Sequence, residues 1–201
     1  FLPYEGPFSN TTVANNTMDG GSTAGDGLPA SSGIAIRHLA SDYWPTGAMS
    51  VDIAGNEITA FVNGISIYDG VNDQYGGLPA GSAINVANNS IAGNSTYGAI
   101  NGGTDTVIAT RNYWGASDGP SGEGAGSGDS VSLNVSYSPW WTDVAMTTLA
   151  YSPNPTFTED EVIGEGESAT VAGTLTVASG TTLRVDGGTL SAGRFELEAG
   201  A

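Results

Sequence analysis

The stretch Thr106–Pro120, TVIATRNYWGASDGP, decides the fold, because three earlier segments repeat part of it. The shared frame is an apolar or small residue, two variable positions, Asn, one variable position and a second apolar residue. This frame occurs as VANNTM (13–18), IAGNEI (53–58), VANNSI (86–91) and ATRNYW (109–114). A frame repeated in this way predicts a stack of similar structural units.

The shared Asn stands at positions 16, 56, 89 and 112, so successive copies are 40, 33 and 23 residues apart. A coil of about twenty residues with loop insertions of different length accounts for this series. Asn tolerates the left-handed backbone of a sharp corner, and stacked amides donate to one neighbour while accepting from the next. We therefore predict a structural ladder formed by Asn16, Asn56, Asn89 and Asn112. The alternative is that Asn is only a frequent turn residue.

A second pattern recurs after each Asn frame, as GIAI (33–36), GISI (64–67) and GAI (98–100). Each coil is therefore expected to contain a strand, the Asn turn, a second strand, a short turn, a Gly-led strand and a variable loop. Gly and Pro interrupt the chain too often for helices of about ten residues. The sequence predicts an all-β protein.

Charge and cysteine content exclude several classes of function. The chain has 21 acidic residues, four basic residues that are all Arg, no Lys, no Cys and a formal charge of −17. This charge disfavours nucleic acid and anionic membrane surfaces, whereas cations or a high-salt medium are compatible with it. The absence of Lys is similar to the amino-acid composition of halophilic surface proteins. No apolar run approaches the ~20 residues of a membrane span, and a start at Phe1 leads us to expect a processed product.

The closing motif carries a resemblance to a known family. RNYWGASDGPSG (111–122), followed by NVSYSPW (134–140), resembles the end of right-handed parallel β-helix proteins of the pectate-lyase-like superfamily. Within that superfamily the segments are most similar to prokaryotic cell-surface β-helix proteins. The resemblance covers about residues 13–143 and implies a right-handed parallel β-helix and an extracellular, cell-surface location. It implies no activity.

Four segments are expected along the chain. Residues 1–12 are read as an N-terminal cap or arm, 13–143 as the β-helix, and 144–161, with their prolines and acidic cluster, as a linker. Apolar pairs between Gly turns predict a second, short β-solenoid over 162–201. Its composition resembles autotransporter-type adhesins. Its repeat still runs at Ala201, so we expect it to be incomplete or completed by another partner.

Catalytic and metal-binding candidates are few. Related enzymes use an Arg base beside Ca²⁺ or paired carboxylates, and neither Arg37 nor Arg111 lies in such a motif, so the chain is predicted not to be an enzyme. No cofactor is expected, with Ca²⁺ as the possible exception. The Ca²⁺ candidates are Asp69, Asn72 and Asp73, and also Asp19 with Asp26, although Asp-Gly is first of all a turn signal.

Surface chemistry supplies the remaining candidates. Tyr43 and Trp44 form the candidate carbohydrate site, because exposed aromatic rings stack on sugars. Tyr113, Trp114, Trp140 and Trp141 are expected to pack together and close the end of the β-helix. Five Asn-x-Ser/Thr sequons are glycosylation candidates: Asn10, Asn15, Asn88, Asn94 and Asn134.

These observations predict an extracellular structural or adhesive surface protein that assembles through its solenoid ends into a filament, sheath or surface layer. The expected partners are copies of itself or other surface proteins. The alternative is a carbohydrate-binding or polysaccharide-degrading β-helix protein.

Overall fold

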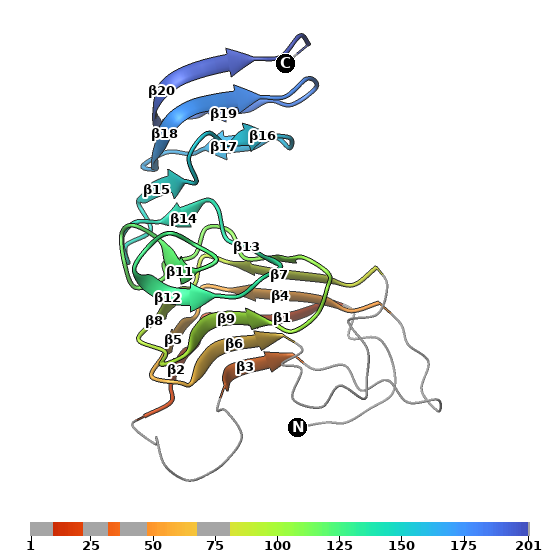
Figure 1. Cartoon of the computed structure of the whole chain (residues 1–201), viewed down its shortest axis with the longest axis vertical. Helices are drawn as coiled ribbons and strands as arrows, with labels where there is room; N and C mark the ends of the chain where they lie inside the picture. The colour runs from red at the N-terminus through yellow and green to blue at the C-terminus, as the bar shows by residue number, and fades with distance from the viewer. Residues whose placement is uncertain (1–9, 22–31, 37–47, 68–80, 201) are drawn as a thin grey trace.

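The computed structural model describes residues 10–21, 32–36, 48–67 and 81–200. This part of the chain consists of β-strands and their connections and contains no helix, so the prediction of an all-β protein is confirmed. It accordingly has no helix long and apolar enough to cross a membrane. The strands are stacked along one long axis, with the first strands at one end and β20 at the other (Figure 1).

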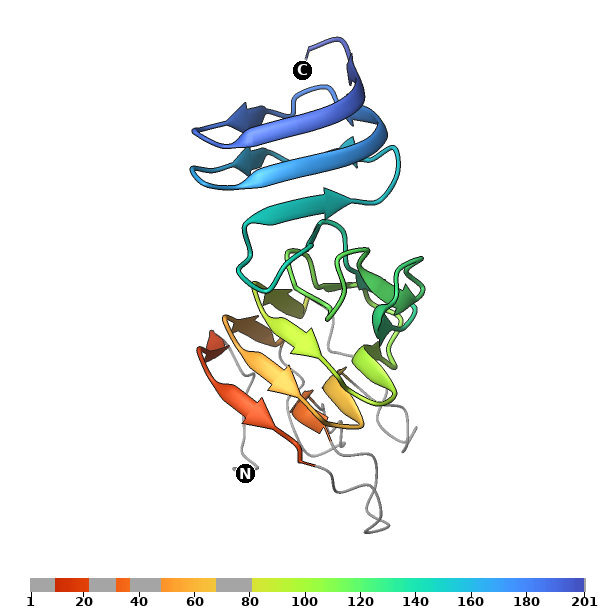
Figure 2. The same cartoon turned by 90° about the vertical axis from the view of Figure 1, so that its left-hand side faces the viewer.

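Three parallel sheets form the first part of the stack, and the chain visits them in rotation (Figure 2). The first sheet has the order β1 (Thr11–Ala14), β4 (Ser50–Ala54), β7 (Ala83–Ala87), β10 (Val107–Ile108) and β13 (Val135–Ser136). The second sheet has the order β2 (Thr17–Asp19), β5 (Glu57–Thr59) and β8 (Ser90–Ala92). The third sheet has the order β11 (Pro120–Gly122), β12 (Gly128–Val131), β9 (Tyr97–Asn101), β6 (Asn63–Ile67) and β3 (Ser32–Ile36).

Identical register places the apolar residues of successive coils above one another. Ile53 of β4 pairs with Val86 of β7, and Ile58 of β5 pairs with Ile91 of β8. All four side chains are fully buried. Because side chains alternate across a strand, this register directs one apolar column from each sheet into a shared core. Burial of each such side chain contributes about 1.5–3 kcal/mol.

The second part of the stack starts with one antiparallel contact and then continues in parallel. β14 (Trp140–Trp141) pairs antiparallel with β15 (Thr148–Tyr151), which pairs in parallel with β18 (Ser168–Val177). β18 also pairs with β16 (Thr156–Phe157) and β20 (Thr189–Leu197), and β17 (Glu161–Ile163) pairs with β19 (Leu183–Val185). A second apolar core, which includes Leu149, Ile163 and Leu175, fills these coils.

The predicted linker at 144–161 was wrong, because these residues contain β15, β16 and the first residue of β17. The prolines that suggested a linker, Pro153 and Pro155, lie in the tight turn between β15 and β16. Asn154 between them adopts a φ of 53°. The second set of coils therefore begins before residue 162.

The predicted N-terminal cap at 1–12 is also too long, because Thr11 and Thr12 already pair with Val51 and Asp52 in the first sheet. Residues 1–9 lie outside the described part of the chain.

Candidate functional site

The predicted carbohydrate and Ca²⁺ sites lie mainly outside the described residues. This holds for Tyr43 and Trp44, for Asp69, Asn72 and Asp73, and for Asp26 and Arg37. Asp19 is described, and its Oδ1 accepts a hydrogen bond from Gly21 N at 2.9 Å, as in a local turn. The described residues contain no group of three His, Cys, Asp or Glu placed to hold a metal ion.

The asparagines of the repeated frame form a hydrogen-bonded column. Oδ1 of Asn56 accepts from the backbone N and from Nδ2 of Asn16, at 3.0 and 2.9 Å. The same pair of bonds joins Asn56 to Asn89 and Asn89 to Asn112, each at 2.9 Å. Each Nδ2 also donates to main-chain carbonyls. Buried polar groups linked in this way stabilise the stack because each donor has an acceptor.

The left-handed corner is formed by the residue before each ladder Asn, which corrects the sequence-based interpretation that the ladder Asn itself makes the turn. These preceding residues are Asn15, Gly55, Asn88 and Arg111, with φ values of 57°, 67°, 56° and 56°. At Gly55, whose φ is 67°, glycine adopts the left-handed backbone without strain, and an added Cβ would lie 2.5 Å from Oδ1 of the exposed Asn15 side chain.

A second polar column, which the sequence did not indicate, runs through Asn94 and Asp129. Asn94 Oδ1 accepts from Phe61 N at 3.1 Å. Asp129 Oδ2 in turn accepts from Asn94 N at 2.9 Å and from Asn94 Nδ2 at 2.7 Å. Asp129 Oδ1 accepts from Gly93 N at 3.0 Å. A single Asn and a single Asp make this column, so no repeated residue marked it.

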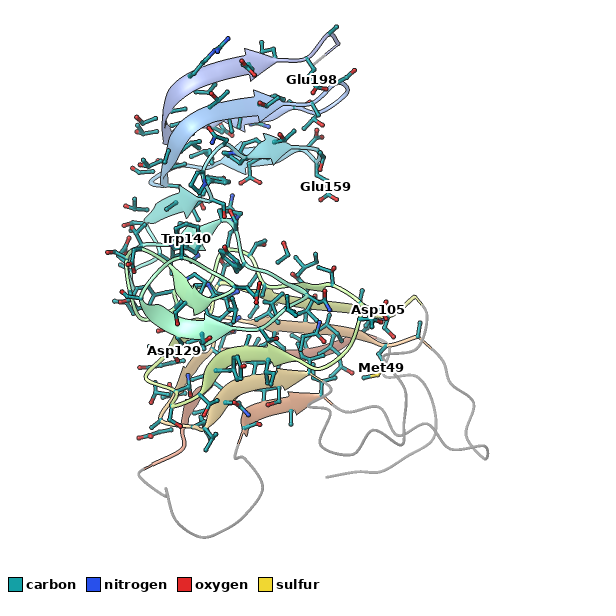
Figure 3. The ribbon with its side chains drawn as sticks, viewed as in Figure 1. Met49, Asp105, Asp129, Trp140, Glu159 and Glu198 are labelled. Carbon is teal, nitrogen blue, oxygen red and sulfur yellow. The ribbon has the colours of Figure 1, made fainter. Side chains whose placement is uncertain are left out.

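A pocket of about 300 Å³ opens beside this second column. Its walls are the corner between β8 and β9 and the β11–β12 region. Apart from Trp114, the lining residues are small or polar. The lining residues are Ala92, Gly93, Asn94, Ser95, Thr96, Trp114, Gly115, Ser121, Ser127, Gly128, Asp129 and Ser130. Figure 3 shows Asp129, a residue of β12, at the opposite side of the stack from Met49 and Asp105.

Asp129 is the titratable group of the pocket. Burial raises the pKa of its carboxyl group above the ordinary value, and the hydrogen bonds from Asn94 and Gly93 oppose part of this rise. The fixed carboxylate is a hydrogen-bond acceptor in a partly desolvated place, where such bonds are stronger than in water.

Arg111 forms the polar joint between the two parts of the stack. Its Nη2 lies 2.6 Å from Glu161 Oε1, and its Nη1 lies 3.2 Å from Glu167 Oε1. Its guanidinium carbon lies 5.7 Å from the centre of the Trp141 ring. Burial lowers the pKa of Arg111, but Glu161 and Glu167 outweigh it and the net pKa is raised. Arg111 of the first part therefore pairs with two carboxylates of the second part.

The four aromatic residues of the closing motifs do not pack into one cluster. The expectation that they together close the end of the β-helix was therefore wrong. Trp114 and Trp140 pack with the first core, whereas Tyr113 and Trp141 pack with the second core. Trp141 Nε1 also donates to Asn88 Oδ1 at 3.0 Å. The motif therefore connects two sets of coils.

The sequons differ in accessibility. Asn94 is 8% exposed, and its Nδ2 donates to Asp129 Oδ2 and Ile58 O, so this candidate has a buried side chain. The other four lie at exposed positions with left-handed backbone: Asn10, Asn15, Asn88 and Asn134. Asn88 and Asn134 also use their side-chain amides in hydrogen bonds.

No protein-family model matches this chain, and neither a curated protein nor a solved structure matches it. The resemblance to the pectate-lyase-like superfamily therefore stands on the quoted motifs alone.

Proposed function

We propose that this chain belongs to an extracellular structural or adhesive surface protein. In this proposal a right-handed parallel β-helix and further β-solenoid coils form one stiff column. The observation that carries the proposal is the continuity of the stack. β14 links both parts, because Trp141 N donates to Asn112 O at 3.0 Å while the same strand pairs with β15.

A column of this kind suits a mechanical role. Each coil contacts mainly its neighbours, so stiffness depends on the backbone bonds, apolar columns and amide ladder between them. The Arg111 ion pairs and the Trp141–Asn88 hydrogen bond add polar contacts where the two parts of the stack meet. The strongly acidic composition fits a salt-rich or cation-rich exterior.

No catalytic role is proposed. Arg111 is engaged by Glu161 and Glu167, and Arg37 lies outside the described residues. The alternative is a carbohydrate-binding or polysaccharide-degrading protein that acts through Tyr43 and Trp44. It stays a prediction, because these two residues also lie outside the described part of the chain.

Assembly is proposed to occur through the ends of the stack. β20 pairs with β18, and no described strand pairs with its other edge. Glu198 N donates to Val177 O, so alternation along the strand directs Leu197 N–H toward the edge of β20 that faces away from β18. Leu197 is 71% exposed. In the proposed assembly a neighbouring copy supplies the strand that continues the stack.

Light scattering at high salt tests this proposal. We expect particles larger than a monomer for the chain and monomers for Leu197→Pro, because proline removes the outward N–H. Leu197→Ala is the control and should still assemble. A monomeric parent chain, or equal assembly of the proline variant, would contradict end-to-end assembly.

A further inference from the structure

We propose that the pocket beside Asp129 binds one neutral sugar residue, with Asp129 Oδ1 as the central acceptor for a sugar hydroxyl. The pocket is formed by Gly93–Thr96 on one side and Ser127–Ser130 on the other. Its volume of about 300 Å³ lies at the small end of the range for ligand sites, which limits the occupant to a single ring.

The pocket offers hydrogen-bonding groups that are not used internally. The hydroxyl groups of Ser95, Thr96 and Ser130 make no hydrogen bond within the described part of the chain. Ser121 and Ser127, in contrast, donate to Gly128 O and Asp118 Oδ1. Three hydroxyl groups that can both donate and accept therefore line the same pocket as the Asp129 carboxylate.

Asp129 is held in place before any ligand arrives. Its Oδ2 accepts both bonds from Asn94, whereas Oδ1 accepts only the bond from Gly93 N. A carboxylate oxygen has two lone pairs, so Oδ1 can accept one further hydrogen bond. A fixed acceptor loses little conformational entropy on binding, which favours even a small ligand.

The same lining argues against other ligand classes. Among the described residues no cationic side chain lines the pocket, and the chain carries a charge of −17, so phosphates, sulfates and acidic sugars are repelled. One carboxylate is too few for a stable Ca²⁺ site, which takes six to eight oxygen ligands. The small, polar lining does not suit an apolar molecule. A neutral, hydroxyl-rich ring is the class that remains.

Titration of the ¹⁵N-labelled chain followed by NMR tests the proposal. The probes are D-glucose, D-galactose, D-mannose and N-acetyl-D-glucosamine, each as the free sugar and as its methyl glycoside. We expect saturable shifts at Gly93, Asn94 and Asp129 for at least one sugar. Binding of the methyl glycoside as well would identify the terminal residue of a glycan as the ligand, whereas binding of the free sugar alone would identify a monosaccharide.

Thr96→Val removes one pocket hydroxyl at constant shape and leaves the Asn94–Asp129 column intact. We expect it to weaken binding about tenfold, the equivalent of one hydrogen bond of about 1.4 kcal/mol. Thr104→Val, at an exposed threonine outside the pocket, is the matched control and should bind like the parent chain.

Three results would overturn the inference: no saturable shift with any of the eight probes, equal affinity in Thr96→Val, or pocket shifts produced by phosphate or CaCl₂ instead of sugar. This inference does not depend on the proposed structural role. The light-scattering experiment tests Leu197 at the end of the stack, whereas the titration tests Thr96 in the pocket, so either proposal can fail without the other.

Discussion

At the scale of single residues, the asparagine ladder connects the repeated frame to stability. The ladder grows more deeply buried along the stack, from Asn16, which is exposed, to Asn89 and Asn112, which are fully buried. Water can replace a lost partner at the exposed end, but it cannot do so in the interior. The same Asn side chain is therefore expected to contribute a different amount to the free energy of unfolding at each position of the ladder.

Asn89→Ala is expected to lower the free energy of unfolding by about 3 kcal/mol. It removes the acceptor of Asn56 N and one acceptor of Asn56 Nδ2. Nδ2 keeps its bonds to Val13 O and Ala54 O, whereas Asn56 N is left without a partner in a buried place. Asn16→Ala is the matched control, and the expected loss is below about 1 kcal/mol. Urea unfolding followed by fluorescence measures both values. Equal losses of unfolding free energy at the two positions would show that the contribution of a ladder Asn does not depend on its burial.

At the scale of elements, the junction between the two parts depends on a small polar cluster around Glu161. Tyr151 of β15 donates its hydroxyl to Glu161 Oε1 at 2.9 Å, the same oxygen that Arg111 contacts. Burial of Tyr151, together with the negative charge of Glu161, raises the pKa of its hydroxyl group above the ordinary value. Tyr151 also packs against Phe157, with ring centres 5.2 Å apart.

The junction is therefore expected to weaken in alkali. The folded-state pKa of Tyr151 exceeds its unfolded value of about 10, so its contribution is complete below pH ~10 and is lost as the pH rises through the folded-state value. The Tyr151→Phe variant has no titratable hydroxyl group at this position. The stability difference between parent and variant should thus shrink as the pH rises above about 10. Urea unfolding at a series of alkaline pH values measures this difference, and a constant or growing difference would contradict the assignment.

The junction also marks where sequence reasoning succeeded and where it failed. The ladder was predictable because the same residue type occupies the same place in four coils. The left-handed corner positions were not, because Asn, Gly and Arg all occupy them and only the backbone is shared. The Asn94–Asp129 column joins residues 35 positions apart that occur once each. Prolines at 153 and 155 suggested a linker because a proline in a turn within a coil and one between domains have the same local signature.

At the scale of the whole molecule, charge opposes the stack that the ladders and cores hold together. The three described arginines already have carboxylate partners: Arg111 with Glu161 and Glu167, Arg184 with Asp186, and Arg194 with Glu196. Most acidic residues in the described part of the chain form no ion pair there. Figure 3 shows Glu159 and Glu198 on the same side of the upper coils. Repulsion between such groups raises the free energy of the compact state.

Salt is therefore expected to stabilise this chain. Raising NaCl from about 0.05 M to about 1 M shortens the screening length to about 3 Å and suppresses repulsion between exposed carboxylates. The Arg111 pairs are only about one-fifth exposed, so they are screened less and keep the junction intact. A gain of about 1 kcal/mol raises the Tm of a chain of this size by about 2–4 °C. Thermal unfolding in NaCl, with sucrose of equal osmolality as the control, measures the effect. A Tm that stays constant or falls with NaCl, or that rises equally in sucrose, would mean that charge repulsion does not limit the stability of the stack.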